Sequence, residues 1–186
     1  MANITREQSL QLLKEYTKSE SLLKHAYAVE AAMRNYAEYF KEDAEKWAVT
    51  GLLHDFDYEM YPDNHPWEGN KILLDKGIDR DICEAIMGHA SFTNTPRNTL
   101  MAKTLFAVDE LSGFITAVTL VRPNKALSEV KPKSVKKKMK DKRFAAKVNR
   151  EEMLLSAEEL GVNFDDHINF VVQAMSKISS DLGLNP

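Results

Sequence analysis

The stretch ESLLKHAYAVEAAMRNYAEYF, residues 20–40, decides the fold class. Its apolar residues recur at mixed intervals of three and four, at Leu22, Ala26, Val29, Met33, Ala37 and Phe40. This spacing is typical of a helix with one buried face. The stretch therefore predicts a long amphipathic helix, and His25 lies within it.

The helical period continues on both sides of this stretch. Thr5 and Gln8 form a capping-box pattern at the start of a first helix. The apolar spacing predicts further helices over about 43–54, 66–77, 79–89, 100–120, 151–160 and 164–182. Proline, asparagine, aspartate or threonine residues gather at 58–64 and 91–98, which predicts loops there. We find no convincing strand alternation and expect an all-α protein.

Composition and length limit the possible classes of protein. The chain has 186 residues, of which 44% are hydrophobic and 28% charged, and this suits a globular domain. With Cys83 as the one cysteine, no internal disulfide can form, so a reducing compartment fits best. The start of the chain lacks the apolar core of a signal peptide, and no stretch approaches the ~20 apolar residues of a membrane span. We therefore expect a cytoplasmic protein that does not bind membranes.

We expect one domain over residues 1–186, because no boundary in the sequence is strong enough to divide it. Its core is predicted at about 20–120, and residues 121–186 form a C-terminal helical extension packed on that core. The oligomeric state is left open.

The charge of the chain is unevenly distributed. The formal net charge is −3, but residues 131–143 hold eight basic residues and one acid, so this segment carries +7 and the rest −10. Such a run is most often a solvated face, although it is also a candidate for binding the phosphates of a substrate. Nucleic acid is an unlikely partner because Phe144 is the one nearby aromatic residue that could stack on bases.

Residues of metal-ligand type recur, singly or in pairs, on successive predicted helices. They are His25, His54, Asp55, His65, His89 and Asp109. The run LFAVDELSGF places Asp109 beside a strongly apolar surface, where an unpaired carboxylate is costly. Any one of the histidines alone is more often a core residue. The ordered set indicates a divalent metal, and Mn, Fe, Ni, Zn and Mg all remain possible.

Several motifs carry a family resemblance. The order of His25, the pair His54-Asp55, and Asp109 resembles that of the HD-domain metal-dependent phosphohydrolase superfamily. AVTGLLHDFD (48–57) looks like its second motif, and HPWEGNKILLDKGIDRDICEAIMGH (65–89) is similar to the stretch that follows it in the two-metal HDIG branch. Phe56-Asp57 replaces the Ile-Gly of that branch. The resemblance, strongest for a small HDIG-related subgroup, implies an HD-type orthogonal helical bundle.

The resemblance also implies a site and an activity. It implies one or two ions, with the first on His25, His54, Asp55 and Asp109, and the second on His65 and His89 with Asp55 bridging. Asp55 is then the candidate catalytic residue that orients a nucleophilic water. The expected substrate is a small phosphorylated molecule of nucleotide type, a phosphomonoester or phosphodiester.

Other side chains are weighed against this site. We expect substrate contacts from Arg122, Lys103, Lys133 and Lys137. Glu110 is expected to point elsewhere on its helix, although it follows Asp109 directly. His167 follows two aspartates and is expected to be exposed.

Two other functions remain open. In the first, the protein is a non-catalytic nucleotide-sensing or regulatory module, and its metal is structural. In the second, it is a di-iron oxygenase on the same scaffold, because the same ligand types would serve. Six ligand-type residues favour the enzyme over a structural site, which needs about four protein ligands and no open position.

Overall fold

The computed structural model describes residues 4–185, which contain ten α-helices and no strand. Residues 1–3 and 186, the ends of the predicted domain, lie outside the described residues. The helices are α1 (Arg6–Tyr16), α2 (Glu20–Phe40), α3 (Ala44–Leu53), α4 (Trp67–Asp75), α5 (Arg80–His89), α6 (Leu100–Leu120), α7 (Pro132–Met139), α8 (Arg150–Leu160), α9 (Phe164–Ser176) and α10 (Ser179–Leu182). The prediction of an all-α protein is confirmed.

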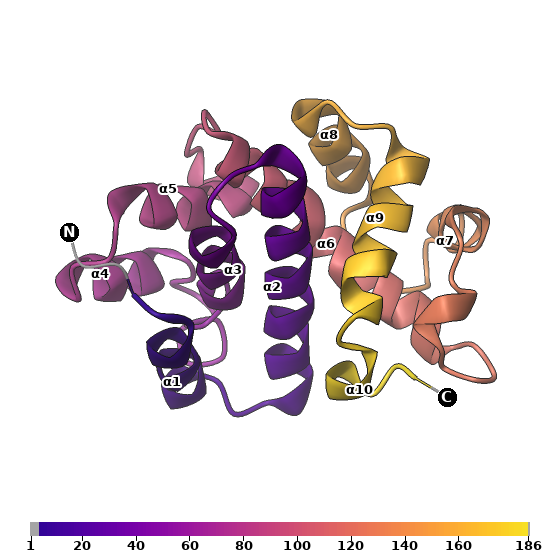
Figure 1. Cartoon of the computed structure of the whole chain (residues 1–186), viewed down its shortest axis with the longest axis horizontal. Coiled ribbons are helices and arrows are strands. Elements are labelled where there is room, and N and C mark those ends of the chain that lie inside the picture. Colours follow the sequence, from indigo (N-terminus) through magenta and orange to yellow (C-terminus); the bar gives the residue numbers. More distant parts are fainter. Residues whose placement is uncertain (1–3, 186) are drawn as a thin grey trace.

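Two long helices form the centre of the molecule. In Figure 1, α2 and α3 lie side by side and α6 crosses behind α2 and α9. α6 contacts α2, α5, α8 and α9, and it is buried on most of its circumference, with Leu111 and Phe114 fully inaccessible. A helix that is apolar nearly all round belongs in a core. Asp109 is therefore held beside the core by a helix that is buried on most of its surface.

The predicted helix boundaries hold closely. α2 spans residues 20–40 as expected and ends where Lys41 adopts a left-handed conformation with φ of 61°. α4 starts one residue later than predicted, because Pro66 occupies its N-cap position. The helix predicted over 164–182 is two helices, and the prediction of one continuous helix is wrong. The chain tightens at Lys177 and Ile178, whose N–H groups bond to carbonyls three residues back.

The C-terminal segment lies against the core. α8 and α9 both pack on α6, and α9 also packs on α2 (Figure 1). His167 of α9 is 1% exposed, so the expectation that it lies at the surface is wrong. Its aspartate neighbours face outward at the helix start, but the helical period turns His167 toward α2 and α6. That the chain forms a single domain over residues 1–186 stays a prediction.

None of the helices within residues 4–185 combines the length and the apolar character needed to cross a bilayer.

Candidate metal centre

Five elements bring the six predicted ligands together. His25 comes from α2, His54 and Asp55 from the end of α3, and Asp109 from α6, and one ligand atom of each lies within 4.8 Å of the others. Asp55 forms a second such group with His65, which precedes α4, and His89, which ends α5. The two groups share Asp55 alone. The fold therefore assembles residues that are up to 84 positions apart in the chain.

The carboxylate of Asp55 lies between the two groups. Its Oδ2 is 3.4 Å from Nε2 of His54, and its Oδ1 is 3.1 Å from Nε2 of His65. Oδ1 also lies 3.3 Å from Nε2 of His89, whereas Oδ2 is 3.9 Å from Nε2 of His25. Each oxygen thus faces a different set of imidazoles. This is the arrangement a carboxylate needs in order to bridge two ions.

Three of the histidines are oriented by their other ring nitrogen. Nδ1 of His54 donates to the Gly51 carbonyl at 2.7 Å, and Nδ1 of His89 donates to the Ile86 carbonyl. The Nε2 atoms therefore carry their lone pairs into the centre. Nε2 of His54 is fully buried and makes no hydrogen bond to any of residues 4–185. A buried, unpartnered imidazole nitrogen fits a metal ligand.

His65 is oriented by a carboxylate. Its Nδ1 donates to Oδ1 of Asp57 at 2.7 Å, and the other oxygen of Asp57 accepts from the Gly69 backbone N–H at 2.7 Å. A Cβ at position 69 would lie 2.6 Å from Cγ of Asp57, so this position requires glycine. Asp57 is 1% exposed. The Phe56-Asp57 departure from the HDIG pattern thus supplies a carboxylate that holds a ligand in place.

The centre has strongly perturbed proton equilibria. Burial alone would lower the pKa of His54, but the charges of Asp55 and Asp109 raise this pKa well above its usual value. Burial likewise opposes ionisation of Asp55, yet His54 and the imidazoles at its two oxygens hold its pKa well below the ordinary range. Burial lowers the pKa of His65, and hydrogen bonds to Asp55 and Asp57 outweigh it, raising the pKa to about 9. The carboxylates of the site therefore stabilise positive charge at the positions that His54 and His65 face.

A cavity of about 300 Å³ opens onto the centre. Besides five of the six ligands it is lined by Tyr58, Ala90, Ser91, Phe92, Glu110, Gly113 and Glu152. The expectation that Glu110 points elsewhere is wrong. Burial first, and then the charges of Asp109 and Glu152, raise the pKa of Glu110 to about 7. Among the described residues, no lysine or arginine lines this cavity.

Sequence reasoning missed Glu152. This residue lies on α8, which packs against α6, so its approach to the centre depends on a tertiary contact outside the motifs. No spacing in the sequence reports it.

The predicted substrate-binding cations lie away from the cavity. Arg122 pairs with Glu129 at 3.3 Å. Lys133 and Lys137 are exposed on α7, and Lys103 lines a neighbouring cavity of about 490 Å³ that shares Ser91 with the metal cavity. None of the four lines the metal cavity as residues 4–185 place it. Their contact with a substrate stays a prediction.

The basic segment is tied to the fold at several points. Lys136 pairs with Asp165 of α9 at 2.8 Å, and the ammonium of Lys138 lies 4.7 Å from the ring centre of Phe144. Just after the segment, Arg150 donates to the carbonyls of Ala145 and Val148. These contacts fit a solvated face with structural anchors better than a segment folded over the metal centre.

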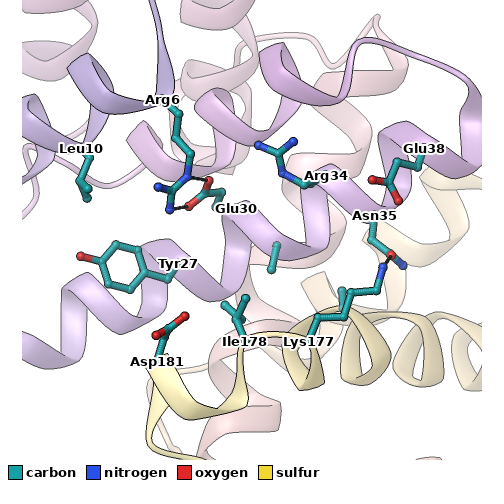
Figure 2. A pocket seen from close by; sticks show the side chains of 12 residues that line it. Arg6, Leu10, Tyr27, Glu30, Arg34, Asn35, Glu38, Lys177, Ile178 and Asp181 are labelled. Atoms are coloured by element: carbon teal, nitrogen blue, oxygen red, sulfur yellow. Dashed lines mark hydrogen bonds and ion pairs between the residues drawn. The ribbon is translucent and has the colours of Figure 1, made fainter.

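A separate cavity of about 550 Å³ lies between α1, α2, α9 and α10 (Figure 2). Its cationic groups are already engaged: Arg6 makes two hydrogen bonds to Glu30, and Lys177 bonds to Asn35. Arg34 bonds to Glu45 outside the cavity. Nine residues, or two and a half helical turns, separate His25 from Arg34, so this cavity lies on the far side of α2 from the metal centre.

The fold and the site define a class: helical proteins that hold divalent metal in clusters of histidine and aspartate. Residues 22–113 match the family model for the HD domain, and the chain belongs to this family of metal-dependent phosphohydrolases. The match runs from α2 into α6 and contains all six ligand candidates. No curated protein and no solved structure matches the chain. Placement in the HDIG-related subgroup stays a prediction.

Proposed function

We propose that the protein is a metal-dependent phosphohydrolase that cleaves a phosphoester of nucleotide type. The observation that carries the proposal is the position of Asp55, with one oxygen toward His54 and the other toward His65 and His89. A site that clamps both the attacking and the leaving oxygen of a phosphoryl transfer needs two ions about 3.5–4 Å apart. A shared carboxylate sets such a separation.

Each ligand group has a defined part in this proposal. The first ion would be held by His25, His54, Asp55 and Asp109, and the second by Asp55, His65 and His89. Divalent ions there would supply Lewis acidity toward a phosphoryl oxygen and acidify water. Asp55 also orients the attacking water, since its carboxylate lies at the centre of both groups. With a single ion bound, His65 and His89 remain free to contact the substrate or carry a proton.

The charge of the cavity favours a substrate of low charge. Asp55, Asp109, Glu110 and Glu152 bring four carboxylates, and only bound ions offset them, because no lysine or arginine of the described chain lines the cavity. Two divalent ions would offset this charge overall. Glu110 and Glu152 are not ligand candidates, however, so the carboxylate of Glu152 and, above its pKa of about 7, that of Glu110 would still face a substrate. A phosphodiester with one negative charge then meets less repulsion than a phosphomonoester with two. We therefore favour the phosphodiester of the two substrate types.

The alternative is a nucleotide-sensing module with a structural metal. A closed structural site uses about four protein ligands and leaves no position open. Here six ligand-type residues adjoin a cavity of about 300 Å³, which leaves room for substrate and water. This favours the enzyme. The ligand types do not distinguish a phosphohydrolase from a di-iron oxygenase, so the test also measures iron content and oxygen uptake.

The test is metal analysis of protein purified without chelator, together with hydrolysis assays. Mn, Fe, Ni, Zn and Mg are supplied in turn, and nucleotides and phosphodiesters serve as substrates. We expect one or two ions per chain and metal-dependent hydrolysis in the wild type, and Asp55→Ala should lose both. Asp63→Ala is the matched control, because Asp63 is an exposed aspartate in the loop before His65. Metal binding without hydrolysis of any ester would support the sensing module instead.

A further inference from the structure

A second cavity adjoins the metal centre through a shared wall. It has a volume of about 660 Å³, twice that of the metal cavity, and both are lined by His25 and Gly113. The other lining residues are Ser19, Glu20, Ser21, Lys24, Thr116, Leu120, Leu182, Gly183 and Leu184. The two cavities therefore meet at one ligand candidate, His25.

Gly113 lies between the two cavities and has no side chain to separate them. A Cβ at this position would lie 3.8 Å from Cε1 and 3.9 Å from Nδ1 of His25, which is ordinary van der Waals contact. An alanine therefore fits, whereas a longer side chain would extend past the imidazole into the shared space. Glycine costs roughly 1 kcal/mol in a helix interior relative to alanine. Its presence in the middle of α6 is explained by the opening that it leaves.

The second cavity has a polar end and an apolar floor. The polar end is the start of α2, where Ser19 is the N-cap and its side chain caps no N–H of the described chain. Lys24 lies one turn further along, and its ammonium bonds to Glu20 at 2.6 Å. Glu20 is 81% exposed, so this ion pair is weak and readily exchanged for a ligand. A helix N-terminus and a lysine together favour an anionic group.

The floor comes from outside the HD-domain match. Thr116 and Leu120 lie on the last turns of α6, and Leu182 and Leu184 are buried residues at and just after α10. The backbone of Leu184 is held in place by a hydrogen bond from the N–H of Leu127 to its carbonyl. The C-terminal extension thus completes a cavity that the HD domain opens.

We propose that this second cavity binds the organic group of the phosphoester. That group is of about nucleoside size, lies on the leucine floor, and carries an anionic group that Lys24 and the start of α2 bind. The inference rests on the proposed function, because the metal centre must hold the scissile phosphate. It assigns substrate selection to Thr116, Leu120, Leu182, Leu184 and Lys24 rather than to the predicted Lys103, Arg122, Lys133 and Lys137.

The other cavities fit this role less well. The cavity that contains Lys103 adjoins the metal cavity only through Ser91, and its Arg97 is engaged by Glu159 in two hydrogen bonds. The cavity of Figure 2 lies beyond α2, and Tyr27 and Glu30 line it in place of any metal ligand. The cavity at Gly113 is the one that meets a candidate metal ligand, His25.

The test uses the metal-loaded full chain and three chromogenic diesters. They are methyl p-nitrophenyl phosphate, the p-nitrophenyl ester of thymidine 5′-phosphate, and the same ester with a 3′-phosphate. We expect Thr116→Trp, which fills the second cavity at a residue that does not line the metal cavity, to lower kcat/KM for both thymidine esters by about tenfold or more through KM. A tenfold loss corresponds to about 1.4 kcal/mol. The methyl ester should stay within about twofold, because its small group does not reach this cavity. Thr116→Val, which keeps the shape of the side chain, is the control and should behave as wild type.

Lys24 is tested with the same esters. Lys24→Ala should lower kcat/KM about tenfold for the ester with the 3′-phosphate alone, since it removes a charge and not the floor. Lys103→Ala should change none of the three. Equal losses on all esters in Thr116→Trp, or selective losses in Lys103→Ala instead of Lys24→Ala, would overturn the proposal. Metal content measured on each variant separates a damaged centre from a blocked cavity.

If the protein is not a phosphohydrolase, the wild type hydrolyses none of the esters with any metal. The cavity is then tested by calorimetry, as binding of thymidine 3′,5′-bisphosphate. Weaker binding in Thr116→Trp and Lys24→Ala, with unchanged binding in Thr116→Val, would support the cavity as a ligand site. Equal binding in all variants would show that the second cavity is not a site for this ligand.

Discussion

Two buried histidines of this protein have opposite chemistry. His54 at the metal centre is fully buried, and His167 between α2, α6 and α9 is 1% exposed. Burial lowers the pKa of both, because it disfavours the charged imidazole. Yet the pKa of His54 is raised well above its usual value, whereas that of His167 falls to about 4. The difference comes from the partners of each ring.

The partners of His167 are all neutral. Its Nε2 donates to the Ala107 carbonyl at 2.9 Å, and its Nδ1 accepts from the Tyr36 hydroxyl at 2.6 Å. Both nitrogens are satisfied, so the ring is a complete structural element. His54 satisfies only Nδ1, and its Nε2 lies 3.3 Å from an oxygen of Asp109 and 3.4 Å from one of Asp55. A buried histidine thus indicates a metal site where carboxylates surround an unpartnered nitrogen.

The largest effect that separates the two histidines is on metal binding. We expect His54→Gln to weaken the first metal more than 100-fold, beyond the 10–100-fold typical of changes to residues that only orient a ligand. His167→Gln should bind metal as wild type does. Metal at 100 times its Kd adds about 2.7 kcal/mol of stability, or roughly 5–10 °C in Tm for a chain of this size. Thermal melts with metal and with chelator measure this gain.

Their outcome decides between the two assignments. The wild type and His167→Gln should show the full gain in Tm, and His54→Gln should lose the part that comes from the first ion. A metal-dependent gain retained in His54→Gln and lost in His167→Gln would reverse the roles given to the two residues.

A smaller effect on metal binding is expected from Asp57. Its carboxylate orients the ring of His65, as the neutral carbonyl of Ala107 orients the ring of His167. Asp57→Asn keeps the shape of the side chain but cannot accept both the Nδ1–H of His65 and the N–H of Gly69 on two carboxylate oxygens. Affinity for the second ion should fall about 10–100-fold while the first ion binds unchanged. Competition with a chromogenic chelator measures the two affinities.

Gly69 provides an independent check on this role. Gly69→Ala places a Cβ against the Asp57 carboxylate and should reproduce the loss without changing any ligand. Equal weakening of both ions in Asp57→Asn would show that Asp57 supports the loop as a whole and does not orient His65 in particular.

Local spacing predicted the elements and the ligand order, because both are properties of neighbouring residues. The period of α2, the caps around α3 to α5, and the succession of His25, His54-Asp55 and Asp109 are all readable along the chain. Contacts between distant elements were not readable. Glu152 reaches the centre because α8 packs on α6, and His167 is buried because α9 packs on α2 and α6.

The hydrogen bond of Asp57 to His65 and the direction of Glu110 were not predictable for a different reason. Each of the two residues directly follows or lies near a ligand, and helical and loop periodicity alone place such neighbours on another face. The chain after Asp55 turns instead of continuing as a helix, which brings Asp57 back to His65. At Glu110, α8 closes over α6, so that a side chain expected at the surface lines a cavity. The direction of a side chain at an element end therefore required the tertiary structure.

The last of the effects concerns stability alone and the region around His167. The folded protein protonates His167 near pH 4, whereas the unfolded chain protonates it at its ordinary pKa of about 6.5. The unfolded state therefore binds more protons between these values, and this residue's contribution to stability falls as pH falls. The loss amounts to about 2 kcal/mol at pH 5 and about 3 kcal/mol near pH 4. His167→Gln removes this dependence, but it costs about 1–3 kcal/mol at pH 7, because the hydroxyl of Tyr36 or the carbonyl of Ala107 loses its partner.

Urea unfolding of chelated wild type and His167→Gln at pH 7 and pH 5 checks the prediction. The wild type should be the more stable at pH 7, and most of its advantage should disappear at pH 5. His54 and His65 also titrate, but their raised pKa values act in both proteins and with the opposite sign, so they cancel in the difference. A constant difference between the two proteins would mean that His167 is protonated in the folded state near neutral pH, and that Tyr36 and Ala107 do not hold it neutral.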